Sequence, residues 1–101
     1  MRIVQSKMFI METVLIFWKG DKDVIHEYIA TFRGFGDQEL VDAYNREARM
    51  GIVGVHRQML YLIALREVMK ERFHHSPIYV ESNIMGMQGE VQLVDGKLCF
   101  K

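Results

Sequence analysis

The sequence predicts an α+β fold for a single domain over residues 1–101, with three helices packed on an antiparallel, or partly mixed, sheet. The first observation is a segment without glycine or proline, residues 55–73, whose centre holds seven consecutive apolar residues, as is typical of a core helix. The second is a pair of amphipathic segments before it, separated by glycine-containing links. The third is the presence of strand-like runs on both sides of this helical region. We expect an N-terminal strand or hairpin and a C-terminal β-meander to join one sheet.

Residues 8–18 form the main N-terminal strand candidate, and a shorter one precedes it at residues 2–4. The longer run is apolar on both alternating faces except at Glu12 and Thr13, which indicates a strand buried on both sides. It is too short to span a bilayer, and no small-residue cleavage site follows it, so neither a membrane segment nor a signal peptide is expected. Met11 is an alternative start codon, in which case residues 1–10 are a dispensable extension.

The first helix is expected to begin after the turn Lys19-Gly20-Asp21, with Asp21 as a candidate N-cap. Apolar residues then recur at helical spacing from Val24 to Phe32, and Gly34 ends the segment.

The second helix is expected to begin at Asp37, another N-cap candidate, and to continue to about residue 50. Asp42 and Arg46 have the spacing and order of a stabilising ion pair on its outer face. Its buried face is expected to consist of Leu40, Val41, Tyr44 and Ala48.

The third helix, residues 55–73, is expected to be the centre of the fold. Its core-facing stripe consists of Tyr61, Leu62, Leu65, Val68, Met69 and Phe73. Met59, Leu60 and Ile63 lie outside that stripe, on the back of the first turns, so the helix is apolar nearly all round at its start. Either a strand layer of this chain covers these three residues, or a second chain does. We therefore expect Met59, Leu60 and Ile63 to lie at or near a subunit contact.

The C-terminal part is expected to form a meander of short strands. The residue before Pro77 avoids the helical region, which ends the third helix, and residues 78–81 and 84–87 are strand candidates. Asp95-Gly96 is a favoured type I′ hairpin turn, and its register pairs Val94 with Lys97 and Val91 with Phe100. That register places Val91, Leu93, Leu98 and Phe100 on one face.

The charge balance and the cysteine count exclude several classes of protein. Lys and Arg together number 13, as do Asp and Glu, so no net field draws the chain to nucleic acid or to anionic lipid. The single cysteine, Cys99, excludes an intramolecular disulfide and a multi-cysteine zinc site. These properties predict a cytoplasmic protein with no membrane partner.

No recognisable catalytic or metal-binding motif is present. The four histidines show no H-x-x-x-H spacing, and the chain has no G-x-S-x-G, P-loop or dinucleotide fingerprint. We therefore expect no catalytic residue, no metal and no cofactor, and Cys99 is expected to be an inert thiol. The alternative for the histidines is a divalent ion at His74 and His75.

The link from Gly51 to Gly54 is the strongest candidate binding site in the sequence. Backbone N–H groups of two glycines ahead of a helix can hold an anion, and the spacing resembles the G-x-x-G loop of KH nucleic-acid-binding domains. The flanking basic residues of this candidate site are Arg46, Arg49, His56 and Arg57. The structural alternative is that the glycines permit a sharp turn, with Ile52 and Val53 packed in the core.

The sequence favours a non-enzymatic interaction module that binds itself, as a homodimer, or another protein. This expectation rests on the apolar excess of the third helix and on the absence of a catalytic motif. The alternative is a small domain that binds nucleic acid or anions through the Gly51–Gly54 link. A third class, a small-ligand enzyme, would be indicated by a deep cavity lined with polar groups.

Overall fold

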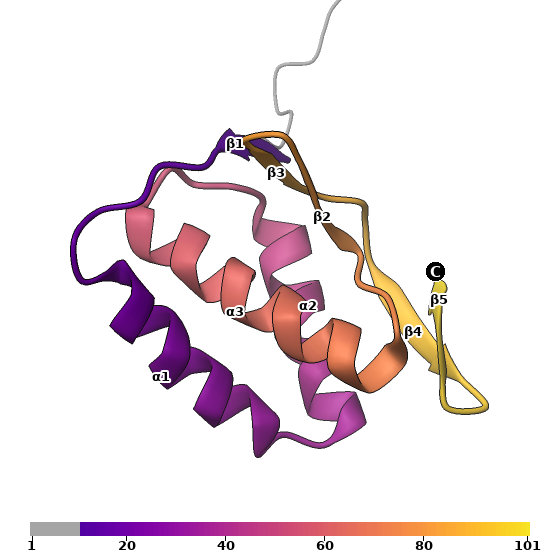
Figure 1. Ribbon diagram of the computed structural model, residues 1–101. Helices are drawn as coiled ribbons and strands as arrows, with labels where there is room; N and C mark the ends of the chain where they lie inside the picture. The colour runs from indigo at the N-terminus through magenta and orange to yellow at the C-terminus, as the bar shows by residue number, and fades with distance from the viewer. Residues whose placement is uncertain (1–10) are drawn as a thin grey trace, which may run out of the picture.

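Three helices form the body of the protein in a computed structural model that describes residues 11–101 (Figure 1). They are α1 (Asp21–Arg33), α2 (Asp37–Met50) and α3 (His56–Phe73), joined by short glycine-containing links. Five short strands follow or precede them in two antiparallel sheets, which confirms the predicted α+β class. No helix within residues 11–101 has both the length and the apolar character needed to cross a membrane.

Helix α3 is the centre of the core, as its apolar pattern predicts. Leu62, Leu65 and Met69 are fully buried, and α1 and α2 both pack against the helix. The predicted buried face of α2 is also confirmed, since Leu40, Val41, Tyr44 and Ala48 all belong to the core.

The back of α3 is covered mainly by its own chain. Met59 and Leu60 are 6% and 3% exposed, so neither presents a surface to a second subunit. Ile63 is half-buried between α3 and α1. The sequence left two alternatives for the apolar start of α3: burial by the same chain or burial by a second chain. Met59 and Leu60 are buried by the same chain, and a subunit contact through them is not supported.

The predicted N-terminal strand differs most from the structure. The strand that forms is β1 (Glu12–Val14), which is short and lies at the edge of the sheet β1-β3-β2. The prediction of a strand buried on both sides is wrong, because Glu12 and Val14 on one face of β1 are exposed. The central place in the sheet belongs to β3 (Ile84–Met87), between β1 and β2 (Ile78–Glu81). Predicted strand residues 2–4 and 8–10 lie outside the described residues.

The side chain of Tyr79 on β2 extends over the backbone of β3 and reaches β1, so it connects all three strands of this sheet. Gly86 lies opposite both Glu12 of β1 and Tyr79 of β2, and the Tyr79 ring packs over it. The Tyr79 hydroxyl then donates to the Glu12 carboxylate. This hydrogen bond, together with burial, raises the pKa of Tyr79 to about 12.

The C-terminal hairpin has the predicted register but belongs to a second sheet. β4 (Val91–Val94) and β5 (Lys97–Phe100) pair Val91 with Phe100 and Val94 with Lys97. The expectation of one continuous sheet is wrong, because α2 side chains bind the start of this hairpin. The Asn45 amide exchanges two hydrogen bonds of 2.8 Å with the Val91 backbone, and the Tyr44 hydroxyl donates to the Gly89 carbonyl at 2.6 Å.

Two side-chain predictions for the first two helices also need correction. Gly20 and Gly36 cap the N-termini of α1 and α2, so Asp21 and Asp37 are the first helical residues. Asp42 accepts a hydrogen bond from the Gln38 amide instead of pairing with Arg46.

Candidate functional site

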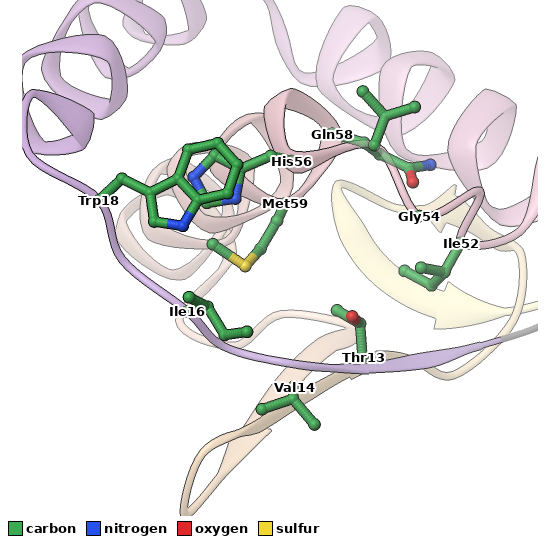
Figure 2. Close-up of a pocket in the computed structure, with 10 residues that line it drawn as sticks. Thr13, Val14, Ile16, Trp18, Ile52, Gly54, His56, Gln58 and Met59 are labelled. Carbon is green, nitrogen blue, oxygen red and sulfur yellow. The ribbon is translucent and has the colours of Figure 1, made fainter.

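An open hollow lies where β1 and the segment after it pass the link between α2 and α3 (Figure 2). Its volume is about 280 Å³. The walls come from residues 13–18 on one side and residues 52–59 on the other, and they are mostly apolar. The lining residues are Thr13, Val14, Ile16, Trp18, Ile52, Gly54, Val55, His56, Gln58 and Met59.

Several large apolar side chains in contact with solvent lie in the two stretches of chain that line this hollow. They lie in two stretches, residues 14–18 and residues 53–55, and each is about half exposed or more. We call this set the apolar rim; Val14, Ile16, Trp18 and Val55 line the hollow, and Phe17 and Val53 are their neighbours in the two stretches. Solvent-exposed apolar residues are common singly, whereas several in two adjoining stretches form an apolar patch.

A cluster of Trp18, His56 and Asp21 holds the first stretch of the rim against the start of α3. The Trp18 ring stacks on the His56 ring, with 3.6 Å between centroids and 13° between planes. The Asp21 carboxylate accepts hydrogen bonds from the Trp18 backbone N–H at 2.6 Å and from His56 Nε2 at 2.8 Å. These contacts fix Trp18 and the segment before α1 against the start of α3.

The Trp18 backbone hydrogen bond and the His56 contact hold the pKa of Asp21 below its ordinary value, against the opposing effect of burial. Asp21 is therefore ionised at neutral pH. A carboxylate only accepts hydrogen bonds, so His56 Nε2 carries the proton that Asp21 accepts. The side chain also lies in the first turn of α1, where the helix dipole favours a negative charge.

The Gly51–Gly54 link is a turn closed by its own chain. Gly51 and Gly54 have φ angles of 79° and 81°, which glycine adopts without strain. The buried Gln58 side chain donates to the Gly51 carbonyl at 2.9 Å and accepts the Val53 N–H at 2.9 Å. It also contacts the buried Glu47 carboxylate at 3.2 Å. Ile52 packs in the core as the structural alternative predicts, whereas Val53 is exposed on the rim.

Each basic residue proposed for anion or nucleic-acid binding is engaged by another side chain of the protein. Arg49 pairs with Glu90 at 2.9 Å, and Arg46 lies 3.4 Å from the Tyr61 hydroxyl. Arg57 packs over the Tyr28 ring at 5.9 Å, and His56 is engaged by Asp21. Arg46 and Arg57 thus lie beside two aromatic rings whose centroids are 5.3 Å apart, whereas Arg49 and His56 are each held by a carboxylate. Binding of an anion or of nucleic acid by these residues stays a prediction.

The hollow offers few groups for chemistry. Its lining holds one hydroxyl, on Thr13, and one imidazole, on His56, while the Gln58 amide is already hydrogen-bonded within the link. Within residues 11–101 no group of three or more His, Cys, Asp or Glu side chains is placed to hold a metal ion. A mostly apolar hollow of this kind can bind apolar groups.

Sequence patterns did not identify the apolar rim. An apolar run without turn residues predicts a buried strand, and residues 14–18 fit that pattern. One signal could have indicated otherwise: the run continues to Trp18, directly before the turn at Lys19-Gly20, where a buried strand would be expected to have ended.

Comparisons with protein-family models, with curated proteins and with solved structures find no match to this chain.

Proposed function

We propose that this protein is a non-enzymatic interaction module that self-associates as a homodimer through the apolar rim. The observation that carries the proposal is a set of six exposed, large apolar side chains in the two stretches that line one open hollow, four of them in its lining. Water-exposed apolar surface of this extent favours association with another apolar surface. In this proposal the subunit contact lies at the apolar rim, whereas the sequence analysis expected it on the back of α3.

The extent of the rim suits a modest but specific contact. Side chains of this size that are half exposed present about 100 Å² each, so the rim offers on the order of 600 Å². A standard protein–protein interface buries about 800 Å² per partner, with a polar border around its apolar centre. The rim supplies the apolar centre of such an interface.

The rim is also well prepared for binding in energetic terms. Ordering a loop and its side chains on association costs about 0.5–1.5 kcal/mol per immobilised side chain. The Trp18–His56 stack and the Asp21 hydrogen bonds already fix part of the rim in the single chain. Association therefore loses less conformational entropy than it would with a mobile segment.

Sedimentation velocity over the micromolar concentration range tests this proposal. We expect a reversible monomer–dimer equilibrium that Phe17→Ser shifts strongly toward monomer, because the substitution removes an aromatic side chain from the rim. Phe100→Ser is the matched control, since Phe100 is 59% exposed, against 58% for Phe17, but lies on β5 away from the rim. A protein that stays monomeric at the highest concentration rules the proposal out.

A further inference from the structure

The outer side of β1 carries backbone groups that no described residue binds. Three hydrogen-bonded pairs tie this segment to β3 and the turn before it: Met11 with Met87, Thr13 with Met85, and Leu15 with Asn83. Because backbone groups alternate along a strand, the N–H and C=O groups of Glu12, Val14 and Ile16 point the other way. Within residues 11–101, none of these groups has a backbone hydrogen-bond partner.

This edge lacks the features with which proteins usually block strand pairing. Lysine, proline or a bulge on an edge strand prevents a second chain from adding to it. Two lysines, Lys97 and Lys101, lie on or next to β5. The stretch from Glu12 to Ile16 contains no lysine and no proline. The charge of Glu12 is engaged by the Tyr79 hydroxyl. Among residues 11–101, nothing therefore covers or blocks the β1 edge.

We infer that two copies of this chain dimerise by antiparallel pairing of their β1 edges, which joins the two three-stranded sheets into one sheet across a two-fold axis. The inference rests on the proposed function and specifies how the apolar rim is covered. A second copy fits this edge because antiparallel pairing is symmetric, so each copy offers the groups that the other one needs. The joined sheet would have six strands, a common size for a stable sheet.

The alternation of backbone groups also sets the register. All three outward-facing residues of each copy are paired when Val14 lies opposite Val14 of the partner subunit and Glu12 lies opposite Ile16 of the partner subunit. A shift of two residues would leave one of the three without a partner. In the full register the two exposed Val14 side chains lie side by side, and Ile16 of each copy extends the apolar contact toward the hollow.

Burial of the apolar rim and backbone hydrogen bonds between the two β1 strands both stabilise this dimer. Strand pairing alone between two short edges is marginal in water. The apolar rim adds on the order of 600 Å² of apolar surface per copy, near the about 800 Å² that a standard interface buries. Backbone pairing in turn fixes which apolar side chains meet.

Disulfide cross-linking tests the register directly. Residues directly opposite in a hydrogen-bonded antiparallel pair have Cα atoms about 5.5 Å apart, within the range that a disulfide spans. We expect Val14→Cys, in a Cys99→Ser background, to form a covalent dimer on mild oxidation at low protein concentration. Val94→Cys in the same background is the matched control, because Val94 and Val14 are both 47% exposed but Val94 lies on the hairpin. Equal cross-linking of both variants would overturn the inference.

A charge at the same position tests the energetics. Val14→Lys places two like charges opposite each other and removes two valines from the contact, so we expect the dimer Kd to rise about a hundredfold. Val94→Lys should leave the Kd unchanged, and circular dichroism checks that both variants keep the fold. If the wild-type protein dimerises and Val14→Lys dimerises equally well, strand pairing is wrong while the homodimer stands. If the wild-type protein is a monomer, both proposals fail.

Hydrogen exchange separates a second copy from cover by the same chain. We expect the amides of Val14 and Ile16 to exchange slowly in the dimer and rapidly after dilution to monomer. Slow exchange of both amides in the monomer would overturn the inference, because another segment of the same chain would then occupy the edge.

Discussion

Single residues near the rim combine a structural and an electrostatic role, and Asp21 is the clearest case. Its carboxylate binds the Trp18 backbone and the His56 ring at once, so one charged group orders the rim and attaches it to α3. Sequence patterns identified Asp21 as a helix cap, because an acid after a glycine at the start of an apolar-periodic segment usually has that role. The local sequence could not show that a histidine 35 positions later faces it.

Asp21→Asn should lower the free energy of unfolding at neutral pH, because the amide keeps an acceptor oxygen but loses the charge. The pKa of Asp21 is lower in the folded chain than in the unfolded chain. Its contribution is therefore complete above the unfolded-state value of about 3.9 and is lost as the pH falls through the folded-state pKa. Urea unfolding of both proteins at several pH values checks this expectation. The difference between them should be constant near neutrality and shrink in acid; equal stability at neutral pH would contradict it.

Elements that depend on local pattern were predicted well, and elements that depend on distant contacts were not. The three helices follow from apolar spacing and glycine links, and the β4–β5 register follows from Asp95-Gly96. The division into two sheets depends on Asn45, whose amide hydrogen-bonds the Val91 backbone as a neighbouring strand would. Nothing in the periodicity of α2 indicates that role. The place of β1 at an edge also depends on its partner, since an apolar strand looks alike in the centre and at the edge of a sheet.

The attachment of β1 to the sheet can be tested at Gly86. A Cβ atom added there would lie 2.5 Å from the Tyr79 ring and 2.8 Å from the Met11 carbonyl oxygen. Gly86→Ala should therefore lower the free energy of unfolding by about 1–3 kcal/mol through displacement of the ring and the strand. Gly36→Ala is the control, because its Cβ would meet only the Glu39 carboxylate at 3.6 Å. Equal, small losses in urea unfolding of the two variants would contradict this account of β1.

The attachment of the hairpin can be tested at Asn45. Asn45→Ala leaves the buried Val91 N–H and C=O without their side-chain partner, and each unsatisfied group costs about 1–3 kcal/mol. We expect a loss of about 2–4 kcal/mol in the free energy of unfolding, with faster hydrogen exchange in β4 and β5. Asn83→Ala, at an exposed turn position, should change little. An Asn45→Ala protein as stable as the Asn83→Ala protein would show that α2 does not hold the hairpin.

On the scale of the whole molecule, the apolar excess of the sequence is distributed differently from the predicted pattern. The back of α3 is largely covered by its own chain, while residues 14–18 and 53–55 carry the exposed apolar surface. The proposed dimer would couple stability to association, since a dimer that buries the rim stabilises the folded chain by mass action. The fold class could be predicted from the sequence, whereas the surface that the proposed function needs could not, because it forms where two distant links meet.

The fluorescence of Trp18 measures the burial of the rim most directly, because Trp18 is the single tryptophan of the chain. Trp18 is 60% exposed in the single chain, so its emission should be red-shifted and open to acrylamide quenching at low concentration. We expect a blue shift and weaker quenching as the protein concentration rises, with the same midpoint as the dimerisation seen by sedimentation, and neither change in Phe17→Ser over that range. Emission and quenching that stay constant through the formation of a dimer would show that the rim is not the contact, and would contradict the account.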